Sequence, residues 1–141
     1  MGDKEGAAEM TGTLYIVGTP IGNLKDVTYR SLELLSDVDL IAAEDTRRTG
    51  VLLKHYEIKT PLTSFNSYNQ AKKSDRLIAR LKEGHNLALV SDAGTPGVSD
   101  PLYHLVRAAL AEYVPVVSLP GPSAVLVALT VSGLPVNRFV F

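Results

Sequence analysis

The sequence predicts an α/β protein with an open, mainly parallel five-stranded sheet and helices on both of its faces. Three observations lead to this fold class. Short apolar runs alternate with helix-like segments, the runs are apolar at nearly every position, and four of them end in a cluster of small or acidic residues. Continuous apolar runs are typical of strands buried on both faces in parallel sheets. Open parallel sheets bind ligands beyond the carboxyl ends of their strands, so we expect the functional residues there.

Length and composition are compatible with one such domain. The 141 residues are 45% hydrophobic and 21% charged, and they include no cysteine. A chain of this length can bury a core without disulfides, and the lack of cysteine excludes thiolate chemistry and suits a reducing compartment. The polar, acidic first ten residues do not resemble a secretory signal, and the apolar stretch 124–131 is too short to span a membrane. We therefore expect a cytoplasmic protein.

The expected elements alternate along the chain, after a loose tail over 1–11. Strands are expected over 13–17, 39–43, 61–65, 86–91 and 114–119. Helices are expected over 27–35, 49–56, 70–83 and 100–112. Asp26 is the expected N-cap of the first helix, and Gly84 is the expected end of the third. This alternation of strands and helices predicts right-handed crossovers between parallel strands.

The last segment predicts a buried helix that this domain alone does not cover. Residues 124–133 are apolar on every side, and a helix without a polar face must be buried under something. Either a partner subunit or a second domain would supply that cover, and we favour the second domain. We therefore expect an α/β domain over 12–135, with 136–141 starting a linker to a C-terminal domain outside this sequence.

The charge pattern predicts no general attraction to nucleic acid. The formal net charge is −1, so any RNA contact must come from a local basic patch. One candidate is the helix expected over 70–83, where Lys72, Arg76 and Arg80 recur every four residues on one face, away from its apolar positions. A basic face of this kind is usually only a solvated surface.

Several common chemistries are excluded or disfavoured by the motifs. The first strand is not followed by the Gly-x-Gly-x-x-Gly pattern of dinucleotide sites, and no P-loop motif is present. The three histidines are isolated in sequence, so we expect no metal site. A hydrolase of the Gly-x-Ser-x-Gly type is also disfavoured. What remains is a set of Gly- and Pro-rich turns that expose backbone groups toward a polar ligand, although any single turn could be purely structural.

Five motifs together resemble the N-terminal half of the ribosomal RNA small subunit methyltransferase I family, within the tetrapyrrole-methylase superfamily of class III S-adenosylmethionine-dependent methyltransferases. Each motif follows an expected strand. They are VGTPIGN at 17–23, AEDTR at 43–47, SFN at 64–66, SDAGTP at 91–96 with SDP at 99–101, and LPGPSA at 119–124 with SGLP at 132–135. The resemblance covers about residues 12–141, and the five motifs in this order are highly specific.

The resemblance implies 2′-O-methylation of a cytidine ribose in small-subunit (16S) ribosomal RNA, with S-adenosylmethionine as the donor and a homodimeric, two-domain protein. The positions matching the family's donor contacts are Pro20, Ile21, Ala93, Gly94, Thr95, Val98, Ser123 and Ala124. Two features depart from the family pattern. Leu102 stands where Asp-Pro is usually followed by Gly, and Glu112-Tyr113 replaces a small, Gly-containing turn. They leave the shape of those two turns open.

The reaction itself indicates which residues to consider on the substrate side. Methyl transfer to a hydroxyl depends mainly on alignment, and a general base would add typically 10²–10⁴-fold. The rim carboxylates Glu44, Asp45, Asp92 and Asp100 are all available as a base. From these, Asp45 and Asp92 are the candidate bases, and each could instead cap a helix or fix a turn. Paired with Arg47, which could hold a phosphate, Asp45 is the first choice. The other candidate substrate contacts are Glu44, Asn23, Asn66 and Tyr68, of which Tyr68 could stack on a base.

Three classes of function remain open. The first is the RNA methyltransferase described above, and the wording of the 43–47 and 91–96 motifs favours it. The second is a methyltransferase of the same fold that acts on a tetrapyrrole or another small precursor. The third is a catalytically silent module that binds a nucleotide or a partner protein.

Overall fold

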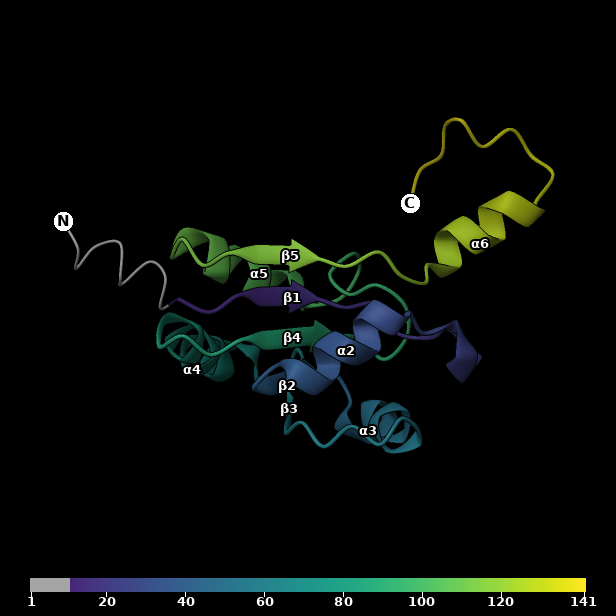
Figure 1. The fold of residues 1–141 in the computed structure, drawn as a ribbon. Helices are drawn as coiled ribbons and strands as arrows, with labels where there is room; N and C mark the ends of the chain where they lie inside the picture. The colour runs from purple at the N-terminus through teal and green to yellow at the C-terminus, as the bar shows by residue number, and fades with distance from the viewer. Residues whose placement is uncertain (1–10) are drawn as a thin grey trace.

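The computed structural model describes residues 11–141, so the expected tail lies outside the described residues except for Thr11. Five parallel strands form one sheet in the order β3-β2-β4-β1-β5. The strands are β1 (Leu14–Ile16), β2 (Leu40–Ala43), β3 (Leu62–Ser64), β4 (Leu87–Val90) and β5 (Val116–Ser118). The arrows drawn for β1, β4 and β5 in Figure 1 all point toward the same edge. The predicted fold class is confirmed.

Helices cover both faces of this sheet. They are the 3-10 helix η1 (Leu24–Asp26) and the α-helices α2 (Tyr29–Asp37), α3 (Thr46–His55), α4 (Gln70–Lys82), α5 (Tyr103–Ala111) and α6 (Ala124–Val131). Side chains of α2 and α3 join the core on one face, whereas those of α4 and α5 join the core on the other. In Figure 1, α2 lies in front of the sheet and α5 behind it.

The central strand β4 shows why the runs in the sequence are continuously apolar. Leu87 and Leu89 belong to the core under α4 and α5, while Ala88 and Val90 belong to the core under α2 and α3. Successive side chains of a strand point to opposite faces, so a strand covered on both sides needs apolar residues throughout. Each fully buried leucine stabilises the fold by about 1.5–3 kcal/mol.

Three predicted helix starts are wrong, each because of a side chain that accepts backbone N–H groups. The first helix begins at Tyr29 because the Thr28 hydroxyl accepts from the Ser31 N–H at 3.0 Å. Asp26, the predicted N-cap, is instead the last residue of η1. The second begins three residues early, at Thr46, because the Asp45 carboxylate caps it. Asp, Asn, Ser and Thr are all good N-cap residues, so a sequence often offers several neighbouring candidates and tertiary packing selects among them.

The helix expected over 100–112 also starts later, at Tyr103. The carboxylate of Asp100 accepts from the N–H groups of Gly97, at 2.9 and 3.0 Å, and Leu102, at 2.9 Å, and so closes a turn before the helix. Leu102, one of the departures from the family pattern, is fully buried in the core. At the other departure, Tyr113 takes a φ of 59°. That conformation costs a non-glycine residue about 1–2 kcal/mol.

The lysine- and arginine-rich helix α4 agrees with its prediction. Leu77, Ile78 and Leu81 are buried, and Arg76 is exposed. The helix ends at Lys82, and Gly84 follows its C-cap residue with a φ of 100°. None of the helices within residues 11–141 has both the length and the apolar character that crossing a bilayer requires.

The predicted apolar helix exists as α6, and it contains no buried residue. It projects away from the sheet in Figure 1, and the chain after it turns back toward the body of the molecule. Val131 is 81% exposed and Leu134 is 70% exposed. Residues 136–141 contain no helix or strand.

Candidate functional site

The loops that follow the five strands meet at the carboxyl edge of the sheet, as expected for a parallel sheet. The strand order places the loop after β4 between the loops after β2 and β1. Three adjoining cavities lie along this edge, and they share lining residues: Ser99 and Asp100 join the first to the second, and Asp92 joins the first to the third. The edge therefore holds one continuous, subdivided site.

The first cavity, called here the acidic cavity, has a volume of about 600 Å³. The loops after β2, β3 and β4 supply its walls. They contribute Glu44, Asp45, Thr46, Arg47, Ser64, Asn66, Ser67, Tyr68, Asp92, Ser99, Asp100 and Pro101. The structure thus brings together six predicted residues: both candidate bases and four of the five candidate substrate contacts.

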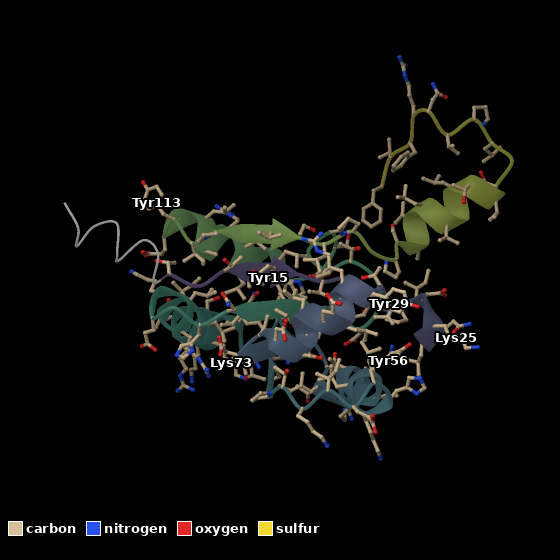
Figure 2. The ribbon with its side chains drawn as sticks, viewed as in Figure 1. Tyr15, Lys25, Tyr29, Tyr56, Lys73 and Tyr113 are labelled. Carbon is tan, nitrogen blue, oxygen red and sulfur yellow. The ribbon has the colours of Figure 1, made fainter. Side chains whose placement is uncertain are left out.

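Hydrogen bonds hold the wall formed by the β3 loop. The Lys73 ammonium donates to the Thr63 hydroxyl at 2.8 Å, and to the carbonyl and hydroxyl of Ser64 at 2.7 and 3.0 Å. Asn69 donates to the same Ser64 hydroxyl, and its side-chain oxygen accepts from the Asn66 N–H. Figure 2 shows Lys73 below the strands and to the left of Tyr56 in this view. Asn66 is therefore held at the cavity wall by its backbone.

Most carboxylates of the acidic cavity are engaged in structural hydrogen bonds. Both oxygens of Asp45 accept from the Arg47 guanidinium, at 3.1 and 3.0 Å, and one also accepts from the Arg47 N–H. Asp92 accepts from the Asp45 N–H at 3.0 Å. Asp100 closes the turn described above. These bonds bind the β2 and β4 loops to each other and to the start of α3.

The electrostatic environment separates the neighbouring acids Glu44 and Asp45. The hydrogen bonds from Arg47 lower the pKa of Asp45 below its ordinary value. Partial burial raises the pKa of Glu44, and the nearby carboxylates of Asp92 and Asp100 raise it further. A carboxylate whose charge is stabilised by a cation is a weaker base, whereas one surrounded by other negative charges is a stronger base.

The second cavity, called here the glycine-loop cavity, has a volume of about 360 Å³. It lies between the loop after β4 and the start of α6. Its walls contain seven of the eight predicted donor contacts, namely Ile21, Ala93, Gly94, Thr95, Val98, Ser123 and Ala124. Pro20, the eighth, lies in the adjoining third cavity together with Asn23 and Arg48. The structure therefore gathers all eight residues in one region, and their donor contacts stay predictions.

Close contacts between three loops shape the glycine-loop cavity. Thr19 and Gly94 exchange backbone hydrogen bonds of 3.0 and 2.9 Å, and the Thr95 hydroxyl donates to the Pro122 carbonyl at 3.1 Å. Gly94 takes a φ of 77°, which a side chain rarely adopts. A Cβ added to Gly18 would lie 3.3 Å from the Cα of Gly121. Glycine is needed because the β1, β4 and β5 loops approach so closely.

The third cavity, of about 300 Å³, is formed by the loop after β1. The Asn23 side chain accepts from the Lys25 N–H at 3.0 Å and so caps η1. The Tyr56 hydroxyl donates to the Leu24 carbonyl and ties this loop to α3. Figure 2 shows Tyr56 and Tyr29 near Lys25, at the opposite side of the molecule from Tyr113.

Two of the predicted substrate contacts, Tyr68 and Arg47, have side chains that are almost fully exposed to solvent. Tyr68 is 97% exposed, and the Arg47 side chain is 90% exposed despite its bond to Asp45. Both are accessible to a ligand larger than the cavity. Their predicted roles, base stacking and phosphate binding, stay predictions.

Sequence reasoning missed Ser99, Arg48 and Phe141 as lining residues. Ser99 belongs to the SDP motif, and its place before Asp100 was a usable signal. Arg48 follows Arg47 directly in sequence, but it lines the third cavity because successive residues of the helix α3 point in different directions. Phe141 follows α6 by ten residues, so only the fold of the C-terminal segment places it at the glycine-loop cavity.

The histidines do not form a cluster at this edge of the sheet among the described residues. His85 stands 3.8 Å from both Asp39 and Glu83, at the amino end of the sheet. Across residues 11–141, no three His, Cys, Asp or Glu side chains are grouped as a metal site would require.

The fold and the site define a class: an open α/β domain with an acidic cavity and a glycine-lined cavity side by side at the carboxyl edge of its sheet. Sequence comparison gives the family. The profile of the tetrapyrrole (corrin/porphyrin) methylases matches residues 13–140. The chain belongs to this family, as its motifs predicted.

The relatives found by sequence comparison include several that have the same name. "Ribosomal RNA small subunit methyltransferase I" from Escherichia coli O157:H7 is 52% identical over 141 residues, which are 100% of this chain and 49% of the relative. The protein of that name from Thermotoga maritima is 55% identical over 130 residues, 92% of this chain and 59% of the relative. The predicted resemblance is therefore confirmed, and the chain spans about half the length of most of these relatives.

Solved structures agree on the fold. A crystal structure of diphthine synthase superposes with a TM-score of 0.73 at 21% identity, covering 92% of this chain and 52% of that one. A uroporphyrin-III-C-methyltransferase from Thermus thermophilus superposes with a TM-score of 0.66 at 25% identity, covering 90% and 55%. Both are about twice as long as this chain.

Proposed function

We propose that this chain is the N-terminal, donor-binding half of a methyltransferase that uses S-adenosylmethionine to methylate the 2′-hydroxyl of a cytidine ribose in small-subunit (16S) ribosomal RNA. The observation that carries the proposal is identity of 52% over all 141 residues to a relative named for methylating that RNA. The two adjoining cavities support it, because a methyl transfer needs a donor site and an acceptor site side by side. A ribosomal substrate would place the protein in the cytoplasm.

The glycine-loop cavity suits a donor of this kind. Its volume of about 360 Å³ is within the range of small-molecule sites, roughly 300–1,000 Å³. Apolar contacts from Ile21 and Val98 alternate with the hydroxyls of Thr95, Ser99 and Ser123. The small residues Gly94 and Ala124 leave room for a ligand beside the backbone. When bound there, the donor would supply an electrophilic methyl group on a sulfonium sulfur.

The acidic cavity would hold the acceptor nucleotide. Asn66 offers amide donors and acceptors to a ribose or base edge, and Tyr68 offers an exposed ring for stacking. The Arg47 guanidinium, held by Asp45, is oriented toward solvent where it can bind a phosphate. Ser99 and Asp100 border both cavities, so the reacting hydroxyl would lie near them.

The proposal includes a second domain and a homodimer for the full-length gene product. The domain would span 12–135, with 136–141 as the start of a linker. The exposed apolar surface of α6 supports this, because such a helix needs cover. The glycine-loop cavity would then be closed by the second domain, and we expect residues 1–141 alone to be inactive. Robust turnover by this fragment would contradict that part of the proposal.

Methyl transfer assays test the substrate. The full-length gene product is incubated with labelled S-adenosylmethionine and, in parallel, with small ribosomal subunits or tetrapyrrole precursors. Label in the RNA, mapped by mass spectrometry to the 2′-oxygen of a cytidine and lost from cells lacking the gene, is the expected result. Label only in the tetrapyrrole would support the alternative substrate class. Absence of donor binding by calorimetry would favour a silent binding module.

A further inference from the structure

Four carboxylates line the acidic cavity, and they differ in the hydrogen bonds that their oxygens accept. Asp45 binds the Arg47 guanidinium with both oxygens. Asp92 accepts from the Asp45 N–H, and Asp100 accepts from two backbone N–H groups. A general base must be able to turn toward the substrate and accept its proton. Asp45 and Asp100 use both oxygens in these bonds, and Asp92 uses one of its two.

Glu44 differs from the other three. Among the described residues, no hydrogen bond from a backbone N–H or a cation to its carboxylate is found, and burial and the neighbouring Asp92 carboxylate raise its pKa. It follows β2 directly and is half-buried in the cavity wall. Asp92 follows the neighbouring strand β4, and β2 pairs with β4 in register, Ala43 opposite Val90. The pairing of β2 with β4 therefore brings together the two loops that carry these carboxyl groups, and Asp92 lies near enough to Glu44 to raise its pKa.

Resting on the proposed function, we propose that Glu44 is the general base, which accepts the proton of the ribose hydroxyl, and that Asp92 is a positioning residue acting through it. As the hydroxyl oxygen bonds to the donor's methyl carbon, its proton passes to a carboxylate oxygen of Glu44. The electron pair of the carbon–sulfur bond stays on sulfur, which becomes a neutral thioether. The proton leaves Glu44 to solvent in the next cycle.

The surroundings of Glu44 favour this role. Asp45, Asp92 and Asp100 face it with negative charge, and Arg47 directs its guanidinium to Asp45. Burial and these acids hold the Glu44 pKa above that of an ordinary glutamate, so its carboxylate is a stronger base at neutral pH. Asp45, assigned first by sequence, has a lowered pKa and is the poorer base.

The test compares the full-length wild type with Glu44→Gln, and with Glu33→Gln as the matched control. Glu33 lies exposed on α2, outside the three cavities. We expect E44Q to lower kcat about 10²–10⁴-fold while the donor Kd changes less than twofold. E33Q should retain both values. Thermal unfolding of each variant verifies that E44Q is folded.

A second readout does not depend on turnover. Carboxyl-carbon NMR of the donor-free protein should give a Glu44 titration above the ordinary glutamate range, and Asp92→Asn should move it to lower pH. The acid limb of the wild-type pH–rate profile should follow the same titration and move with D92N. A merely structural role for Asp92 would not produce this coupled movement.

The outcomes separate the two proposals. A folded E44Q whose kcat stays within threefold of wild type overturns the inference, as does a D92N variant that leaves the Glu44 titration unmoved. If the wild type transfers no methyl group to ribosomal RNA, the proposed function fails and the inference falls with it. If the wild type is active on RNA and E44Q is not, both stand.

Discussion

Within residues 11–141, the two ends of the same sheet differ in whether a carboxylate is left without a backbone or cationic partner. At the amino end, the Asn86 side chain accepts from the Thr13 N–H at 2.9 Å, and the Asp39 carboxylate accepts from the Asn86 N–H at 2.7 Å. These bonds tie β1, β2 and β4 together where the strands begin. At the carboxyl end, Glu44 faces a cavity and another carboxylate.

The difference teaches which polar residues to associate with function. A side chain that satisfies a backbone group stabilises the fold, because an unpaired buried N–H costs about 1–3 kcal/mol. A carboxylate placed among other carboxylates costs stability, and such groups concentrate at functional sites. The amino end should therefore respond to substitution with lost stability alone, whereas the carboxyl end should also respond with lost ligand binding or catalysis.

The largest expected effect tests packing at the amino end. In Gly12→Ala, the added Cβ would lie 1.7 Å from the carbonyl oxygen of His85, so the backbone must move. We expect a loss of about 3 kcal/mol in the free energy of unfolding, at the upper end for an overpacked site. Donor affinity of the folded protein, measured by calorimetry, should stay within twofold. An unchanged unfolding midpoint would contradict the structure here.

At the carboxyl end, Gly94→Ala should affect both stability and binding. Its φ of 77° makes the substitution cost about 1–2 kcal/mol, and the new Cβ would contact Ile21 at 3.4 Å beside the glycine-loop cavity. We expect donor affinity to fall at least about tenfold, equivalent to about 1.4 kcal/mol.

Gly97→Ala provides the matched control for that prediction. Gly97 also takes a left-handed φ, of 92°, but a Cβ there would meet open space, and Gly97 does not line the glycine-loop cavity. The two variants should lose similar stability, as judged from urea unfolding. An equal loss of donor affinity in both would mean that strain, and not the cavity wall, governs binding.

Asn86→Ala should give a smaller effect confined to stability. The substitution leaves the Thr13 N–H without its acceptor, and we expect a loss of about 1–2 kcal/mol from chemical denaturation. Methyl transfer by the folded full-length protein should be unchanged. A loss of turnover larger than the unfolded fraction explains would show that the amino end also takes part in function.

The smallest expected effect is a pH-dependent contrast between neighbours. The folded pKa of Asp45 is lowered, so its contribution is present above the unfolded pKa and is lost as pH falls through the folded value. The folded pKa of Glu44 is raised, so its charged form destabilises the fold at neutral pH and protonation relieves this. At pH 7, D45N should lower the thermal midpoint and E44Q should raise it slightly. Calorimetric scans should show the E44Q advantage disappearing as pH falls through the Glu44 pKa.

Much of the fold was predictable because its signals are local. The five strands fall within the predicted ranges. The central strands β2 and β4 are buried at every position and continuously apolar, whereas the edge strands β3 and β5 are only partly buried. Helix starts were less predictable. Thr28 and Asp26 are both good capping residues, and only packing of α2 against the sheet selects Thr28.

The members of the candidate site were largely predictable, but their individual roles were not. The motifs identified the loops that line both main cavities. They did not distinguish the acids, because the sequence contains no record of which carboxylate meets a backbone N–H from another loop. Asp92 accepts from Asp45 across 47 positions of the chain, and that contact needs β2 and β4 to be neighbours.

The sequence by itself determined the class of the molecule: apolar runs too continuous for any but doubly covered strands, each leading into polar turns at a shared edge. The tertiary structure decided which of those turns touch. Strand order depends on long-range packing of helices against two faces. It brings Glu44 close to Asp92, while the nearby Arg47 guanidinium binds Asp45. A carboxylate's chemistry depends on the charges within a few ångströms of it, so the distinction between the acids arises only when the chain is folded.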